Sequence, residues 1–284
     1  MAVSDSLGTE HTITLPAGPL RYRDLGAGPP VVFVHGLLVN GDLWRDVAPA
    51  VAAAGYRCLT PDWPLGAHTV PLPPGADLSP PGVARMIADF LVALDLTEVT
   101  VVANDTGGAL TQILMTEHPE RLDRVVLTPC DAFDEFFPQP FTALPAMMKI
   151  PGFAWVMAAT FQVRTLWPAL LGGMSKRLAS REVMLSYTRP CWRDRAVRRD
   201  LRRFTAGVHR KYTLRAGQAL DGFDRPVLLV GAGQDRVFKP RLREALAARL
   251  PKARQVVLAD SYTFVPEDQP AELARLVVEF QRSG

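Results

Sequence analysis

Features that mark several other protein classes are missing from this sequence of 284 residues. It holds only three cysteines, Cys58, Cys130 and Cys191, which are far apart and include no CxxC pair. An odd number at such spacing predicts buried, reduced side chains rather than a disulfide framework. No apolar run approaches the roughly 18 to 20 residues that cross a bilayer, and the N-terminus lacks the basic and apolar regions of a signal peptide. We therefore expect a cytoplasmic protein without a membrane partner.

Signatures of bound groups are also few. His, Cys and carboxylate residues do not recur at metal-binding spacing, and no phosphate-binding loop or GxGxxG motif is found. Gly231 and Gly233 follow a predicted strand, but they lead to Asp235 and fit an acid-bearing loop better than a nucleotide site. We expect no metal, no cofactor and no nucleic-acid partner.

The formal net charge is only +3, although arginine is concentrated in residues 189–215. We interpret this stretch as a solvated helix face, with recognition of an anionic substrate or partner as the alternative.

The overall composition is that of an ordinary soluble protein. Hydrophobic residues make up 48% and charged residues 21% of the chain. Short β-branched runs alternate with longer segments of helical period, which is typical of a parallel sheet with right-handed crossovers. The predicted strands are 31–34, 57–60, 99–103, 124–128, 226–230 and 254–258, and the predicted helices are 43–54, 81–94, 108–118, 240–250 and 270–282. The sequence therefore predicts an α/β fold with a mostly parallel central sheet flanked by helices.

One stretch breaks this alternation. Residues 131–222 have apolar and arginine residues at helical spacing and contain no convincing strand. We predict a helical cap inserted into a core of residues 1–130 and 223–284, over the carboxyl edge of the sheet, where open α/β sheets bind ligands. Residues 64–82, rich in Pro and Gly, are expected to form a surface loop. Large apolar side chains of the cap predict a lining for a small to medium apolar substrate; they are Phe133, Phe136, Phe137, Phe141, Met147, Met148, Phe153, Trp155, Met157 and Phe161.

The clearest chemical signal is a turn motif. The strand ending near Ala103 continues through Asp105, Thr106, Gly107 and Gly108 into a helix. Small residues around a central reactive side chain are typical of the nucleophile elbow, a strained turn between strand and helix. A side chain at Gly107 would clash with the preceding strand, and the N-terminus of the following helix favours an ionised Asp105 carboxylate. Taken alone, an Asp before two glycines would be an ordinary helix cap.

Three further segments argue against the helix-cap interpretation. Residues 35–38 follow the first predicted strand, where the backbone amide of Leu37 would complete an oxyanion hole with that of Thr106. Asp235 follows a later strand, and residues 261–270 form a loop before the closing helix. The order nucleophile, acid, histidine loop is the one that such a fold requires. Asp105 is therefore the predicted nucleophile and Asp235 the predicted acid.

With these motifs the chain resembles the α/β-hydrolase superfamily over nearly its whole length, and particularly the haloalkane dehalogenase and epoxide hydrolase branch. The resemblance implies that Asp105 attacks an sp³ carbon to give an alkyl ester, which a histidine-activated water then hydrolyses. In the family motif the histidine lies seven residues before a proline that corresponds to Pro270, and this position is Thr263 here. Because threonine is no general base near neutral pH, hydrolysis of the ester should be severely slowed.

Two histidines and two tyrosines are candidates for the missing proton-transfer roles. We interpret His68 as part of a surface loop and His209 as a cap surface residue, with contact to Asp105 as the alternative for each. The resemblance to epoxide hydrolases makes Tyr187 and Tyr212 candidate substrate-binding residues and proton donors. A structural role is the alternative for both tyrosines.

The dehalogenase resemblance is incomplete, because Leu37 and Thr106 stand where those enzymes place halide donors. Asp131 and Asp134 follow strand 124–128, either as alternative acids or as helix caps. Three hypotheses stay open. The chain is a cofactor-independent epoxide or haloalkane hydrolase, a non-hydrolytic lyase, isomerase or cyclase with Asp105 as acid or base, or an inactive ligand-binding homologue. A homodimer is also left open.

Overall fold

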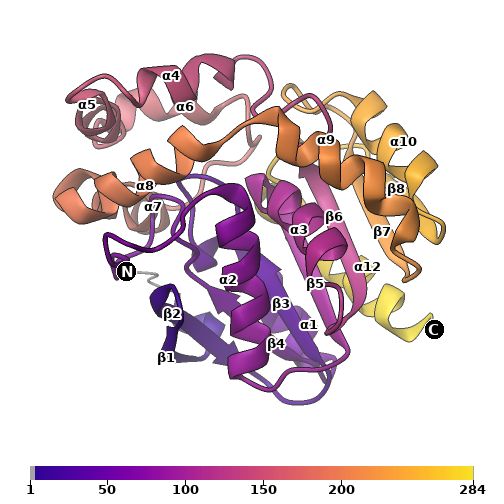
Figure 1. Ribbon diagram of the computed structural model, residues 1–284. Coiled ribbons are helices and arrows are strands. Elements are labelled where there is room, and N and C mark those ends of the chain that lie inside the picture. Colours follow the sequence, from indigo (N-terminus) through magenta and orange to yellow (C-terminus); the bar gives the residue numbers. More distant parts are fainter. Residues whose placement is uncertain (1–3, 284) are drawn as a thin grey trace.

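A single eight-stranded sheet forms the centre of the computed structural model, which describes residues 4–283 (Figure 1). Its order is β1-β2-β4-β3-β5-β6-β7-β8. β2 runs antiparallel to both of its neighbours, and the other adjacent pairs are parallel, so the predicted mostly parallel sheet is confirmed. The strands are β1 (Thr9–Leu15), β2 (Gly18–Leu25), β3 (Pro30–Val34), β4 (Arg57–Pro61), β5 (Val99–Asp105), β6 (Leu122–Cys130), β7 (Val227–Ala232) and β8 (Ala253–Leu258).

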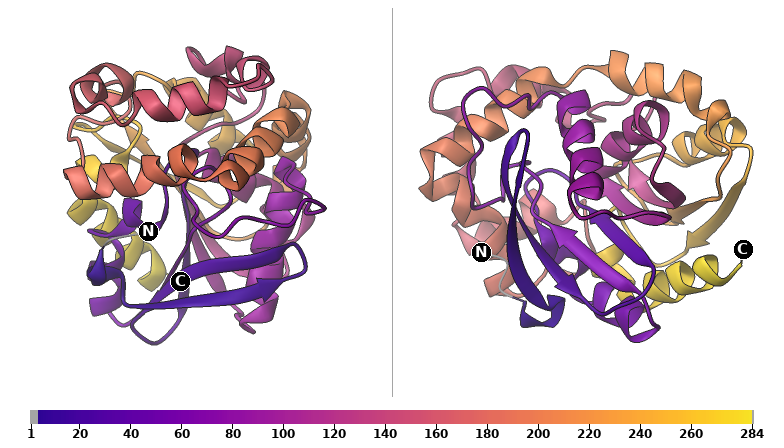
Figure 2. Two further views of the ribbon diagram at one scale, coloured as in Figure 1. Left: turned by 90° about the vertical axis from the view of Figure 1, so that its left-hand side faces the viewer. Right: turned by 60° about the horizontal axis from the view of Figure 1, so that its bottom comes forward.

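Helices cover both faces of this sheet. α2 and α3 pack together on one face, and α1 packs against α12 on the other (Figures 1 and 2). The helices outside residues 131–222 are α1 (Ala48–Ala53), α2 (Pro80–Ala93), α3 (Thr106–Glu117), α10 (Pro240–Arg249), α11 (Val265–Asp268) and α12 (Pro270–Arg282). Short 3-10 helices are η1 (Asp5–Leu7), η2 (Gly41–Trp44), η3 (Phe141–Ala143), η4 (Arg164–Leu166) and η5 (Leu220–Gly222).

The local sequence explains the elements that carry the site. Every residue of β5 is buried, as expected for a central strand of a parallel sheet covered on both faces. α2 begins at Pro80, and the hydroxyl of Ser79 accepts a hydrogen bond from the amide of Gly82, so both preferred start signals are present. The three cysteines are unpaired and buried, as predicted.

Residues 131–222, called here the helical segment, contain helices but no strand in the part of the chain that the structure describes. α4 to α8 lie together at one end of the molecule, while α9 returns to pack against α3 (Figures 1 and 2). The division into a core and an inserted cap at these residues stays a prediction. The helices are α4 (Leu144–Met147), α5 (Phe153–Thr160), α6 (Trp167–Leu171), α7 (Arg181–Arg193), α8 (Arg195–Gly207) and α9 (Arg210–Ala219).

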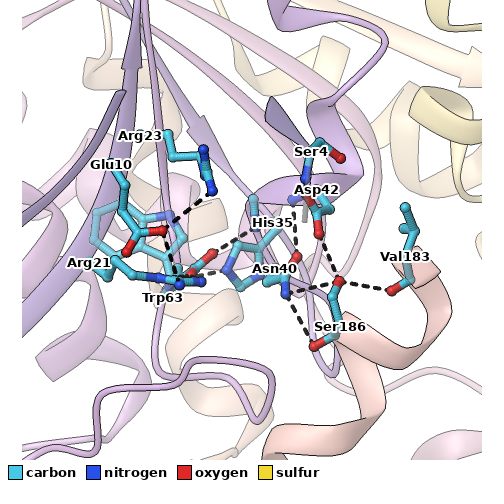
Figure 3. Close-up of polar contacts among 12 residues, drawn as sticks. Ser4, Glu10, Arg21, Arg23, His35, Asn40, Asp42, Trp63, Val183 and Ser186 are labelled. Carbon is cyan, nitrogen blue, oxygen red and sulfur yellow. Dashed lines mark hydrogen bonds and ion pairs between the residues drawn. The ribbon is translucent and has the colours of Figure 1, made fainter. Parts of the chain in front are cut away.

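A buried polar network holds α7 against the loop that follows β3. Figure 3 shows Ser186 of α7 directed toward Asn40 and Asp42. The Ser186 hydroxyl donates to Asp42 Oδ2 at 2.7 Å, and Asn40 Nδ2 donates to the Ser186 carbonyl at 3.3 Å. Since all three side chains are buried, these bonds replace lost hydration and fix the helix in one position.

Two features were not predicted from the sequence. β1 and β2 form an N-terminal antiparallel hairpin, but the side chains of β1 are mostly exposed and only Ile13 and Leu15 are apolar, which is too short an alternation to predict a strand. The expected loop is confirmed for residues 64–79, but its surface position is wrong, because many of its side chains, including Leu65 and His68, are buried. α8 covers this loop, and the amide of Leu72 donates to Asp200 Oδ2 of that helix at 2.8 Å.

The arginine-rich stretch is more than a solvated face. Arg198 donates to the carbonyl of Cys191 at 2.7 Å, and Arg202 Nε donates to the carbonyl of Met148 at 3.0 Å. Arg199 and Arg203 donate to backbone carbonyls of the loop that α8 covers. These guanidinium groups therefore tie α8 to its surroundings, which the periodicity of the sequence could not reveal.

Candidate active site

Asp105 lies at the junction between β5 and α3, with φ of 56° and ψ of −132°. A positive φ is rare for a residue with a side chain and marks a strained turn. A Cβ on Gly107 would lie 2.3 Å from the carbonyl oxygen of Val34, and one on Gly108 would lie 2.3 Å from Cys130 Cβ. The obstacle at Gly107 is thus the neighbouring strand β3, not the preceding strand β5 that the sequence interpretation named.

We expect Gly107→Ala to lower the free energy of unfolding by about 3 kcal/mol, because the added methyl group meets backbone that cannot move away. Urea denaturation measures this loss. Gly75→Ala is the matched control, since nothing lies within 4 Å of a Cβ at that glycine. Equal stability of the two variants would contradict the close approach between the elbow and β3.

The Asp105 carboxylate is held by backbone amides. The amide of Leu37 donates to Oδ2 at 3.1 Å, and the amide of Thr106 also bonds this carboxylate. A Cβ on Gly36 would lie 2.1 Å from Oδ2, so only glycine leaves room for this arrangement. The two predicted oxyanion-hole residues therefore both contact Asp105 itself.

Burial, with a smaller contribution from the nearby Asp235 charge, raises the pKa of Asp105 to about 6, although the bonds from the Thr106 and Leu37 amides oppose the rise. The folded state therefore binds more protons than the unfolded state between about pH 4 and pH 6, and this contribution to stability falls as pH rises through that range. At pH 7 the buried charge costs roughly 3 kcal/mol.

Asp105→Asn should consequently stabilise the fold at pH 7 by roughly 2 to 3 kcal/mol. The gain should shrink toward zero near pH 3, below both pKa values, where the wild-type carboxyl is mostly protonated in the folded and the unfolded state. Urea denaturation of both proteins at the two pH values measures the difference. A gain that does not change with pH would show that Asp105 does not carry the raised pKa.

His35 supports the loop that supplies the Leu37 amide. Its Nδ1 donates to the carbonyl of Gly36 at 2.9 Å, and its Nε2 accepts from the amide of Trp63 at 2.9 Å. Burial lowers the pKa of His35 to about 4, so the ring is neutral at pH 7. Figure 3 shows this ring beside Trp63. His35 is a structural residue of the site.

Thr263 is in contact with Asp235. Its hydroxyl donates to Asp235 Oδ1 at 2.7 Å, and the amides of Val237 and Phe238 donate to the same oxygen at 2.8 and 3.0 Å. Burial raises the pKa of Asp235, and its Oδ2 is buried with no hydrogen-bond partner among the described residues. Asn104 Nδ2 donates to the Thr263 carbonyl at 2.9 Å, which joins this loop to the elbow.

None of the five histidines hydrogen-bonds Asp105 or Asp235 within residues 4–283. His68 is buried and faces Asp200 of α8, with Nε2 to Oδ2 at 3.5 Å. His209 is exposed and accepts from the amide of Lys211 at the start of α9. His35 has the structural role described above, His11 stacks on Tyr22 and His118 ends α3. Neither candidate base is brought to the site.

The two candidate tyrosines have different surroundings. Tyr187 of α7 lines the cavity beside Asp105, and its hydroxyl donates to Glu267 Oε1 at 3.1 Å. Arg45 holds the same carboxylate through both terminal nitrogens, at 2.7 and 2.5 Å. Tyr212 of α9 instead packs on the cluster of Ala84, Ile113 and Ala216, away from the cavity. Glu267 was not predicted as a site residue, because its only sequence signal is a carboxylate within the loop 261–270.

Asp131 is a third buried carboxyl next to the elbow. The Thr106 hydroxyl donates to its Oδ2 at 3.2 Å, and Oδ1 is buried with no hydrogen-bond partner among the described residues. Burial, and then the charge of Asp105, raise the pKa of Asp131 well above its usual value. Asp134 is exposed.

A cavity of about 270 Å³ lies between Asp105 and the helical segment. Its wall is mostly apolar, and the helical segment contributes Phe137, Phe141, Met157 and Phe161 from the predicted series, whereas Met147 and Trp155 are exposed. The polar lining residues are Asp105, Thr106, Ser175, Arg177, Tyr187, Thr188 and Glu267.

Within the described residues no cluster of His, Cys, Asp and Glu could hold a metal ion, and no helix is long and apolar enough to span a membrane.

Comparison with known proteins defines the class: the chain belongs to the α/β hydrolase fold family, whose model matches residues 29–270. It is 26% identical over 267 residues to Haloalkane dehalogenase 2 of Mycobacterium tuberculosis, covering 92% of this chain and 91% of the relative. A crystal structure of a haloalkane dehalogenase from Bradyrhizobium elkani is 21% identical with a TM-score of 0.79, covering 97% and 99% of the two chains. An epoxide hydrolase structure is 18% identical with a TM-score of 0.79, covering 96% and 98%.

The family match confirms the predicted superfamily, and the similarity to these named proteins supports the predicted dehalogenase and epoxide hydrolase branch. The named relatives also support the expectation of a hydrolase-type enzyme. At these identities the solved structures establish the fold alone.

Proposed function

We propose that Asp105 acts as a nucleophile on a small to medium apolar substrate, attacking a saturated carbon to form an enzyme-bound ester. The carrying observation is the carboxylate itself: the backbone amides of Leu37 and Thr106 hold it, and Asp105 lines the cavity. A fixed carboxylate in an apolar cavity needs little reorganisation before attack.

An epoxide fits the cavity better than a haloalkane. No Trp indole or Asn amide is among the described residues that line it, so a departing halide would find no neutral N–H side-chain donor there. Tyr187 supplies a hydroxyl at the wall. In the proposed step, a carboxylate oxygen of Asp105 forms the new C–O bond, the epoxide C–O bond breaks, and the Tyr187 proton passes to the released oxygen.

The second step, hydrolysis of the ester, lacks its usual base under this proposal. Thr263 takes the position of the family's histidine, and its contact with Asp235 supports that correspondence. Loss of a general base costs about 10² to 10⁴ in rate. The ester should therefore accumulate and limit turnover.

The pKa of about 6 for Asp105 favours a second candidate. A carboxyl that titrates near neutral pH is suited to proton transfer, so Asp105 would serve as acid or base in an elimination, isomerisation or cyclisation. This chemistry needs neither an ester nor a histidine. An inactive, ligand-binding chain is the third outcome.

Product formation from a panel of epoxides and haloalkanes tests the proposal. We expect epoxides to react and Tyr187→Phe to slow their opening about a hundredfold, because the proton donor is lost. The fold should persist, since Arg45 still holds Glu267. Thr188→Val is the matched control, because Thr188 lines the same wall but donates to the carbonyl of Met184. Equal losses in both variants, or haloalkanes as the preferred substrates, would contradict the role of Tyr187.

A further inference from the structure

Exposed apolar side chains are concentrated on one part of the helical segment. Ten large hydrophobic residues are exposed in the described chain, and eight of them lie within residues 147–178: Met147, Ile150, Trp155, Val156, Val163, Leu166, Leu170 and Leu178. They belong to α4, α5, α6 and the turns between and after them, which form the outer end of the molecule (Figures 1 and 2). Concentrations of this kind mark interaction sites.

The charges of the same part of the chain have one sign. Residues 136–181 contain five Lys and Arg residues and no Asp or Glu. Lys176 forms an ion pair with Asp260, but the exposed side chains of Lys149, Arg164, Arg177 and Arg181 have no ion-pair partner among the described residues. We call these four residues and the eight exposed apolar residues the basic apolar face.

We propose that the basic apolar face docks on the surface of an anionic lipid bilayer. Apolar side chains with a half-exposed tryptophan among unpaired cations are the combination that binds at the lipid interface. Each cation near an anionic leaflet strengthens binding about fivefold. We expected no membrane partner from the sequence because it has no apolar run long enough to cross a bilayer. Docking at the lipid surface needs no membrane-spanning helix, so that reason does not apply to this contact.

A second copy of the chain fits this face less well. In a symmetric dimer the same patch meets itself, so the unpaired cations of one copy would face those of the other. Like charges brought together in this way disfavour association. An anionic surface neutralises them instead.

The cavity wall continues into the basic apolar face. Leu170, Arg177 and Leu178 line the cavity and are also exposed. Docking would therefore bring the cavity mouth to the lipid, from which an apolar substrate could enter without crossing water. This route rests on the proposed function, whereas the lipid contact itself does not.

Sedimentation with vesicles tests the contact directly. The full chain should bind vesicles of equal parts phosphatidylglycerol and phosphatidylcholine, and bind pure phosphatidylcholine vesicles at least tenfold more weakly. Ile150→Ser/Trp155→Ser and Lys149→Gln/Arg164→Gln should each lower binding to the anionic vesicles at least tenfold. Val92→Ser/Val257→Ser and Arg249→Gln change exposed residues elsewhere and should leave binding within twofold.

Fluorescence adds a readout at one residue. Trp155 is 50% exposed, whereas Trp44, Trp63 and Trp167 are buried and Trp192 is partly buried. When anionic vesicles are added, the tryptophan emission maximum of the wild type should move to shorter wavelength, because Trp155 leaves water. Trp155→Phe should bind the vesicles equally well but show no such shift. Absence of binding to anionic vesicles, equal binding by the face variants, or a dimer that only the face variants lose would each overturn the proposal.

Discussion

Asp105→Asn is expected to abolish both ester formation and turnover, with a loss of at least a thousandfold in kcat/KM, because the amide is no nucleophile toward a saturated carbon. The variant should be well folded and, at pH 7, more stable than the wild type, since the buried charge is gone. Loss of activity in a stabilised protein separates a chemical role from a structural one. Steady-state kinetics on the best epoxide substrate measure the effect.

Asp131→Asn provides the matched control for this loss. Asp131 is also buried beside the elbow, but it contacts the Thr106 hydroxyl and does not line the cavity. We expect a reduction of no more than tenfold. If Asp131→Asn lost as much activity as Asp105→Asn, the reaction would depend on the carboxyl pair rather than on Asp105 as nucleophile.

Thr263→His is expected to accelerate turnover by about 10² to 10⁴, which is the usual contribution of a general base. The ring would meet Asp235 where the Thr263 hydroxyl does now, and that carboxylate would orient it. The gain should follow pH with the ionisation of an imidazole, rising as the ring loses its proton. Thr263→Ser keeps only the hydroxyl and should show no gain.

Because Thr263 is fully buried, the larger ring could disturb the fold. Thr263→Gly with added imidazole gives an independent measurement, since the free base can enter the space that the side chain leaves. Faster release of the ester with increasing imidazole would support the missing-base account. No acceleration in either experiment, with both proteins folded, would contradict it.

The strands of the core were predicted to within a few residues because buried strands of a parallel sheet have a direct sequence signal. The predicted strand at 99–103 is β5 (Val99–Asp105), and that at 226–230 is β7 (Val227–Ala232), and every residue of both strands is buried. The hairpin of β1 and β2 was missed because an exposed edge strand buries few side chains. The loop at 64–82 was misjudged because its burial depends on α8, more than a hundred residues later.

The site shows the same division between local and distant signals. The elbow and the loops that contain Leu37, Asp235 and Thr263 follow predicted strands or precede a predicted helix, so their meeting at one edge of the sheet could be expected from chain order. The contact of Tyr187 with Glu267 depends on how α7 settles over the core, which no local pattern encodes. The roles assigned to these residues remain predictions for experiment.

Intact-protein mass spectrometry during incubation with an epoxide tests the central claim most directly. The account predicts a mass increase equal to that of the substrate, mapped by peptide analysis to Asp105, which persists in the wild type and decays faster in Thr263→His. Product formation by the wild type without any adduct on Asp105, together with full activity of Asp105→Asn, would contradict it.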